Sequence, residues 1–217
     1  MKLVVGLGNP GKAYEGTRHN IGFEVLSQMC TRFAIGNLKS KFKGQVGEAE
    51  IGGKKVLLLY PLTFMNLSGQ AVKAAVDFYK LPLADLILVC DDLSLEPGRI
   101  RIRSGGSAGG QKGLLNTIQQ LGSEAFPRLR IGIGSAPGER SAADYVLSTF
   151  SKSERALMDV AVMRAVDAIE AWVGSGIDVA MNRFNPDPMS EQKQKSRRIP
   201  SDGASGLGNA ETSNKTN

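Results

Sequence analysis

The chain has 217 residues, 41% of them apolar, which suits one globular domain with a sizeable core and a tail. Its formal charge of +6 favours an anionic partner such as nucleic acid, although a moderate basic excess is also common in soluble proteins. Cys30, Cys90 and a single histidine exclude a zinc-binding spacing and a disulfide framework, and no apolar run suits a signal peptide or a membrane span. We therefore expect a soluble cytoplasmic protein with reduced cysteines.

Residues 4–23, VVGLGNPGKAYEGTRHNIGF, form the most informative stretch of the chain. A buried strand over 2–7 is expected to end in a glycine and proline turn, and the polar loop that follows carries His19. Histidine is the side chain that exchanges a proton near neutral pH without special help. A lone histidine is more often structural, but loops on a rigid scaffold concentrate catalytic groups, so His19 is a candidate.

The glycines of this stretch also match the fingerprint of dinucleotide-binding folds, but we reject that interpretation. The fingerprint requires a helix that opens at the glycines and an acidic residue about 20 positions later. Residues 12–18 have no apolar stripe, and residues 25–47 contain no Asp or Glu. The glycines instead predict a sharp turn that leaves the Asn9 amide pointing into the space above a sheet.

A helix and a hairpin are expected next. Apolar residues recur at helical spacing over 21–33, and Gly36 ends that helix. Two candidate strands, about 43–51 and 54–60, then flank a Gly-Gly turn, which is a strong hairpin signal.

The segment PLTFMNLSG, residues 61–69, is expected to open a helix that runs to Tyr79. Phe64 and Met65 are core residues by default, because large apolar side chains usually are. Asn66 lies where a strand gives way to the helix start, so it is either an N-terminal cap or a functional residue.

A second apolar strand over 85–90 runs directly into Asp91 and Asp92. In open α/β sheets the carboxyl ends of parallel strands deliver their loops to one edge, where ligands bind. If this strand lies beside the first, Asp91 and His19 meet at that edge, and the carboxylate holds one tautomer of the ring. Either aspartate is alternatively a cap of the next turn, which is the interpretation we favour for Asp92.

Arginines and isoleucines alternate over 99–103, which gives that strand one basic and one apolar face. A strand over 128–133 places Arg130 near the basic face, after a short helix over 111–121. The loop SGGSAGG at 104–110 adds open backbone N–H groups. Loop and arginines therefore form either a phosphate-binding surface or a solvated face beside a flexible loop.

A long helix is expected to begin after Ser151, where Ser151 and Glu154 form a capping box, and to stop at Gly174. Trp172 is interpreted as a core residue. The apolar stripe that packs on the sheet comprises Leu157, Val160, Ala161, Ala165, Ala168, Ile169 and Trp172.

Residues 186–217 are polar and lack aromatic side chains, which predicts a disordered tail after a domain over 1–185. From Asp187 onward the chain holds five of the 27 basic and four of the 21 acidic residues. The remaining 22 basic and 17 acidic residues give +5, so the basic character belongs to the folded part.

Three segments together resemble the signature segments of bacterial-type peptidyl-tRNA hydrolases: GLGNPGKAYEGTRHNIGF, PLTFMNLSG and DDLSLEPGRIRIRSGGSAGGQKG. Their order and spacing match over about residues 1–185. The resemblance implies an α/β fold with a twisted mixed sheet flanked by helices on both sides. It also implies a monomer that hydrolyses the ester between peptide and tRNA, releases tRNA for reuse in translation, and needs no cofactor and no metal.

The resemblance also implies a role for each matching position. His19 is implied to be the base that activates water, Asp91 its stabilising carboxylate, and Asn9 the group that tells blocked from free aminoacyl ends. The positions implied to bind tRNA are Tyr14, Phe64 and Asn66 around the terminal nucleotide and the ester, and Arg103 and Arg130 at the 5′-phosphate of the acceptor stem.

One position departs from the family pattern. Most members have glycine, histidine, asparagine, glycine where this chain has Gly110-Gln111-Lys112-Gly113, so Lys112 replaces an asparagine expected to contact substrate. Lys112 either faces the substrate or points to solvent. The alternative function is that of a non-catalytic RNA-binding relative, as in plant organelle splicing factors of this fold. The intact His19, Asp91 and Asn9 argue against it.

Overall fold

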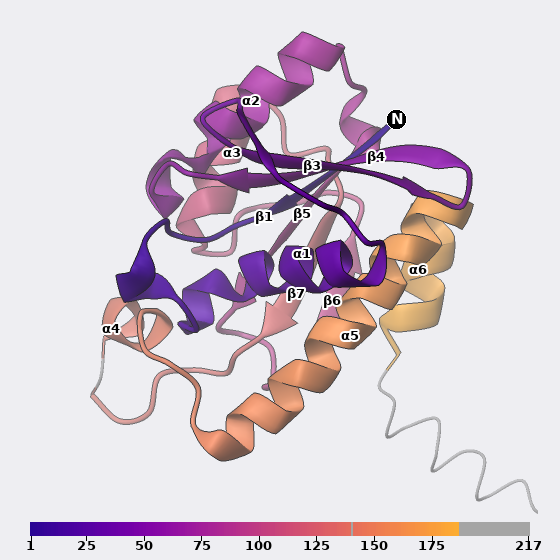
Figure 1. The fold of residues 1–217 in the computed structure, drawn as a ribbon. Helices are drawn as coiled ribbons and strands as arrows, with labels where there is room; N and C mark the ends of the chain where they lie inside the picture. Colours follow the sequence, from indigo (N-terminus) through magenta and orange to yellow (C-terminus); the bar gives the residue numbers. More distant parts are fainter. Residues whose placement is uncertain (140, 187–217) are drawn as a thin grey trace, which may run out of the picture. The chain divides into compact units, whose positions relative to one another are not determined.

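The computed structural model describes residues 1–139 and 141–186, which form an α/β fold with a seven-stranded mixed sheet (Figure 1). The compact unit spans Met1–Asn185. The tail predicted for 186–217 lies outside the described residues, apart from Pro186. Within the described ranges, none of the helices has both the length and the apolar character that a membrane crossing requires.

The sheet is built around four parallel strands. Its strands are β1 (Lys2–Gly6), β2 (Lys39–Lys41), β3 (Gly44–Ile51), β4 (Lys54–Pro61), β5 (Leu86–Asp92), β6 (Ile100–Arg103) and β7 (Arg128–Gly132). Their order is β2-β3-β4-β1-β5-β7-β6, with β4, β1, β5 and β7 parallel and with β3 and β6 antiparallel to their neighbours. The loops that follow the parallel strands therefore leave from the same edge of the sheet.

Helices cover both faces of this sheet (Figure 1). The α-helices are α1 (Ile21–Arg32), α2 (Ser68–Tyr79), α3 (Lys112–Leu121), α4 (Ala142–Val146), α5 (Lys152–Ser175) and α6 (Ile177–Phe184). Short 3₁₀ helices are η1 (Lys12–Tyr14), η2 (Arg18–Asn20), η3 (Met65–Leu67) and η4 (Leu83–Asp85). Alternate strand residues face the two layers: Val4 packs with α1, α5 and α6, whereas Leu3 and Val5 pack with α2 and α3.

Two glycines bring α1 unusually close to the sheet. A Cβ on Gly22 would lie 2.5 Å from the backbone of Leu7 and Val89, and a Cβ on Gly6 would lie 2.3 Å from the Gly22 carbonyl oxygen. Neither position accepts a larger side chain without a backbone shift. This close contact sets the start of α1, and with it the preceding η2, at the carboxyl ends of β1 and β5.

The predicted strands and the capping box of α5 are confirmed, with small differences at the ends. The first helix ends at Arg32, before the predicted Gly36, because Ala34 adopts a left-handed φ of 48° and the Ile35 N–H bonds the Cys30 carbonyl. The last long helix passes through Gly174 and ends at Ser175. Gly176 follows with a φ of 91°.

Part of the stripe predicted for α5 is wrong. Leu157 is 52% exposed and Val160 is 68% exposed, whereas Met158 and Val162 are buried. Val160 lies one residue, or about 100°, round the helix from the buried Ala161, so it faces away from the sheet. The rest of the stripe is buried, and Trp172 is a core residue at 1% exposure.

Candidate active site

A cleft of about 660 Å³ opens where the parallel strands end. The loop after β1 contributes Asn9 and His19, and β5 contributes Asp91. The remaining lining comes from the β4–η3 region, the Leu93 turn, the start of α3, β7, and α4. These residues are Phe64, Met65, Asn66, Asp92, Leu93, Gly109, Gly110, Gln111, Lys112, Arg130, Ala142, Ala143, Val146 and Leu147.

His19 and Asp91 form a buried pair in this cleft. Because β1 and β5 are parallel neighbours, the predicted meeting of the two side chains at one edge is confirmed. His19 Nδ1 lies 2.9 Å from both Asp91 oxygens, and the residues are 8% and 3% exposed. An ionised carboxylate only accepts hydrogen bonds, so Nδ1 carries the proton. In the neutral ring, His19 Nε2 is then the acceptor.

Arg18 fastens the short helix that carries His19. Its Nη1 donates to Ser148 and Thr149, and its Nη2 pairs with both carboxylate oxygens of Glu154 at 2.7 and 2.8 Å. Burial favours the neutral carboxyl, but hydrogen bonds from Ser151 and Arg18 outweigh it and lower the pKa of Glu154 to about 2. The capping box of α5 and the anchor of His19 therefore share one carboxylate.

Asn9 is held in one orientation. Its Oδ1 accepts the Met65 backbone N–H at 2.8 Å. Its backbone N–H and carbonyl exchange two hydrogen bonds with the Asn20 side-chain amide, at 2.8 and 3.0 Å. Since Asn9 is only 7% exposed and lines the cleft, its Nδ2 donor is the part of the side chain left to face the cleft.

Gln111 joins the buried pair, and sequence reasoning missed it as a site residue. Its Nε2 lies 3.2 Å from Asp91 Oδ1, and its Oε1 accepts the Leu114 N–H at 2.8 Å as the N-cap of α3. The signal was present in the departure from the family pattern at this position.

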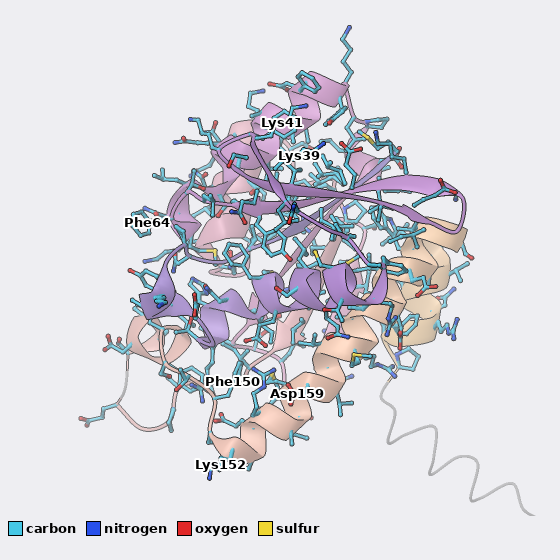
Figure 2. All side chains as sticks on the ribbon, viewed as in Figure 1. Lys39, Lys41, Phe64, Phe150, Lys152 and Asp159 are labelled. Atoms are coloured by element: carbon cyan, nitrogen blue, oxygen red, sulfur yellow. The ribbon has the colours of Figure 1, made fainter. Side chains whose placement is uncertain are left out.

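Two of the residues predicted at the tRNA end, Phe64 and Asn66, are exposed, and Tyr14 is half-buried. Phe64 is 55% exposed, so its default assignment to the core is wrong, whereas Met65 is buried as expected. Figure 2 shows the Phe64 side chain projecting outward. Asn66 is exposed and does not cap α2, whose N-cap is Leu67. Asn66 lies within η3, before the N-cap of α2, and it lines the cleft instead.

Tyr14 and Lys112 flank this exposed region. The Tyr14 ring meets the Phe64 ring edge-on, with the ring centroids 6.4 Å apart. Phe64 lines the cleft, whereas Tyr14 lies next to the lining. Lys112 is the first residue of α3, and it is exposed and part of the lining.

The two phosphate candidates are separated along the sheet. Arg130 lines the cleft and pairs with Asp92 at 2.8 Å, while Asp92 also accepts the Ser94 N–H, as predicted for a turn cap. Arg103 is exposed, and in the β6–β7 pair it lies opposite Arg128. Arg128 precedes Arg130 by two residues on β7. Arg103 therefore lies outside the cleft, roughly 7 Å further along the same sheet face.

Buried Arg128 organises the glycine-rich loop. Its guanidinium donates to the carbonyl oxygens of Gly106, Ser107, Glu124 and Phe126. Burial lowers the pKa of this guanidinium from its ordinary value. The loop over 104–110 is therefore fixed through its carbonyl groups. Its use as a phosphate surface stays a prediction.

Part of the cleft wall is apolar, and it comes from α4, a helix that the sequence analysis did not predict. Three residues of α4 and the residue that follows it line the cleft: Ala142, Ala143, Val146 and Leu147. The helix has only five residues, too few for an amphipathic period, but Ser141 caps it by accepting the Asp144 N–H. That Ser-x-x-Asp pattern was the available signal.

Known proteins share this sequence and fold. The family model described as peptidyl-tRNA hydrolase matches residues 3–196. The peptidyl-tRNA hydrolase of Rhodopirellula baltica is 51% identical over 185 residues, covering 85% of this chain and 97% of that protein. For that of Geobacillus kaustophilus the identity is 48%, over 85% of this chain and all of that protein.

A solved structure agrees with these sequence matches. The crystal structure of peptidyl-tRNA hydrolase from Acinetobacter baumannii superposes with a TM-score of 0.80 at 37% identity, covering 85% of this chain and 94% of that one. Similarity of this extent covers the whole sheet and the cleft. The chain therefore belongs to the peptidyl-tRNA hydrolase family.

Proposed function

We propose that this protein hydrolyses the ester bond between peptide and tRNA in peptidyl-tRNA, which releases tRNA for reuse in translation. Family membership supports the substrate. The observation that carries the chemistry is the His19 Nδ1 to Asp91 contact of 2.9 Å in the wall of the cleft. That pair is consistent with a catalytic dyad of base and carboxylate.

His19 is the general base in this proposal. With Nδ1–H donated to Asp91, Nε2 accepts a proton from a water whose oxygen attacks the ester carbonyl carbon. The tetrahedral intermediate then expels the ribose oxygen, which takes the proton back from Nε2. Asp91 stabilises the protonated ring in between, and every proton is accounted for without a second nucleophile.

Asn9 selects blocked substrates. Its Oδ1 is occupied by the Met65 N–H, so it offers only N–H donors to the cleft. A blocked amino end carries a carbonyl oxygen that accepts such a donor. A free amino end is an ammonium group with donors and a positive charge, so it finds no acceptor here and binds less well.

A second set of residues, at the rim of the cleft and beside it, binds the tRNA end. Asn66, at the rim of the cleft, donates to the ester carbonyl oxygen as negative charge develops on it. Phe64 and Tyr14 offer ring faces and edges for stacking with the terminal base. Arg130, with Arg103 further along the sheet, pairs with the 5′-phosphate of the acceptor stem.

The cleft therefore has one polar and one apolar wall. The apolar surface of α4 suits a peptide whose side chains vary, because apolar contact does not require a particular sequence. We further propose that residues 1–185 suffice for this activity as a monomer in the cytoplasm. Size-exclusion chromatography with light scattering tests the monomer.

The decisive experiment measures release of N-acetyl-amino acid from purified N-acetyl-aminoacyl-tRNA, with free aminoacyl-tRNA as the control substrate. Multiple turnover of the blocked ester and slow hydrolysis of the free one support the proposal. Tight RNA binding without turnover would instead favour the non-catalytic RNA-binding alternative.

A further inference from the structure

The Gln111 amide has a fixed orientation. Its Oε1 accepts the Leu114 backbone N–H at 2.8 Å, and a backbone N–H is only a donor. The oxygen therefore faces the helix, and the nitrogen faces Asp91 Oδ1 at 3.2 Å. The contacts at both ends of the side-chain amide require the same placement of its oxygen and nitrogen, because the carboxylate needs a donor and the helix N-terminus needs an acceptor.

Capping alone does not explain glutamine at this position. Ser, Thr, Asp and Asn are the residues preferred at an N-cap, because their short side chains reach back to the first turn. The longer glutamine side chain spans from the α3 cap to the active-site carboxylate. It can do so because Gly113 leaves room: a Cβ there would lie 3.1 Å from Gln111 Oε1 and 2.6 Å from Met65 Sδ.

The same amide also touches the Asn9 anchor. Gln111 Nε2 lies 3.2 Å from Met65 Sδ, and the Met65 backbone N–H is the group that fixes Asn9. Gln111 is 8% exposed and Asp91 is 3% exposed, so water has little access to replace a lost donor. One buried network thus joins the start of α3 to Asp91, His19 and Asn9.

We infer that Gln111 is a positioning residue of the active site, which fixes the Asp91 carboxylate against His19 by an amide that α3 locks in place. This inference rests on the proposed function. Asp91 Oδ1 receives donors from His19 and Gln111 together, so the carboxylate cannot turn about its bond to Cβ without breaking one of them. Gln111 therefore acts on the reaction through Asp91 and His19.

Gln111→Ser tests the inference while keeping the helix cap. Serine caps well but is too short to reach Asp91. We expect a wild-type melting temperature, kcat lower by about tenfold, as for one lost hydrogen bond to a charged group, and KM within about twofold. The matched control is Gln120→Ser, an exposed glutamine on the same helix, which should leave all three unchanged.

Gln111→Glu is the second variant. It keeps the length and the cap, but it turns an acceptor towards Asp91 and adds negative charge beside the ring. The added charge favours protonated imidazole, so the acid limb of the kcat/KM profile should move to higher pH. A residue that merely caps α3 would leave that limb in place.

The single histidine gives a readout independent of turnover. In tag-free protein, the imidazole ¹H and ¹⁵N signals belong to His19 alone. We expect one Nδ1-protonated tautomer in the wild type and Gln120→Ser, and a shifted Nδ1–H signal or mixed tautomers in Gln111→Ser. Wild-type kcat, pH profile and imidazole signals in both Gln111 variants would overturn the inference. An inactive wild type would overturn the proposed function, while the imidazole spectra would still decide the role of Gln111.

Discussion

The two sides of the cleft that meet the ester are built differently. The buried side, defined as Asn9, His19, Asp91 and Gln111, is at most 8% exposed, and each member has at least one side-chain hydrogen bond. The exposed side, defined as Phe64, Asn66 and Lys112, makes no side-chain hydrogen bond to the part of the chain that the structure describes, and it reaches 55% exposure at Phe64.

This difference matches the demands of the two tasks. Proton transfer requires geometry that exists before the substrate arrives, since a misplaced base loses the benefit of proximity. Binding a long RNA and a variable peptide tolerates side chains that become ordered with the substrate. Substitutions on the buried side should therefore lower kcat, and substitutions on the exposed side should mainly alter KM and its salt dependence.

His19→Ala should have the largest effect. The methyl group cannot accept a proton, so kcat should fall by about 10²- to 10⁴-fold. Substrate binding should survive because Arg130 and the exposed side are untouched. Single-turnover hydrolysis and filter binding of N-acetyl-aminoacyl-tRNA measure the two effects. Near wild-type turnover would contradict the base assignment and place the chemistry elsewhere in the cleft.

Asp91→Asn should come next, with kcat lower by about 10²-fold and an intact fold, because an amide facing Nδ1 disturbs the tautomer and stabilises the protonated ring less. Asp92→Asn is the matched control on the same strand. Asp92 bonds Ser94 and pairs with Arg130, so its loss should alter binding more than kcat. A larger fall in kcat for Asp92→Asn than for Asp91→Asn would reverse the two assignments.

The Arg18–Glu154 ion pair, which anchors the helix that carries His19, predicts that the stability of the folded state falls at acid pH. The pKa of Glu154 is lowered to about 2 from its ordinary value of 4.5, so its carboxylate stabilises the folded state above pH 4.5. That contribution is lost as the pH falls from 4.5 towards 2. Urea unfolding should show Glu154→Gln less stable than wild type at pH 7, with a gap that narrows on acidification. Glu96→Gln, on the surface, should show no such gap.

The sequence predicted the buried side better than the exposed side, for a physical reason. Apolar runs that end in polar residues mark parallel strands, and parallel strands end together, so the meeting of His19 and Asp91 followed from two local patterns. Exposure depends on which neighbours happen to cover a residue. Residue type therefore favours the core for Phe64, and only the fold shows that 55% of this residue is exposed.

Short elements give only weak local signals in a sequence, and long-range contacts give none. The α4 helix is too short for a period, and β2 is an edge strand of three exposed residues. The Arg18 anchor joins residues 136 positions apart, which no spacing reveals. The sequence indicates only a helix start at Gln111, because its contact with Asp91 arises from the fold, which brings the start of α3 beside the end of β5.

Lys112→Asn should have a small effect on the exposed side. Lysine has three donors, no acceptor and a positive charge, and its removal from the cleft takes away repulsion of the protonated ring. We expect kcat to be kept, the acid limb of kcat/KM to move slightly to higher pH, and binding to weaken at low salt. Lys152→Asn, on an exposed residue outside the cleft, is the control. Superimposable profiles would show that Lys112 does not act on the dyad.

Deletion of residues 187–217 should have the smallest effect, since their composition predicts no packed contacts. Asn185 is the matched comparison. Its side-chain amide bonds both the N–H and the carbonyl of Ile102, at 2.7 and 3.0 Å, and so occupies the free edge of β6. Asn185→Ala should lower stability by about 1 kcal/mol, whereas the deletion should leave melting temperature and kcat/KM unchanged. A deletion more harmful than Asn185→Ala would show that the segment contributes to the fold or to tRNA binding.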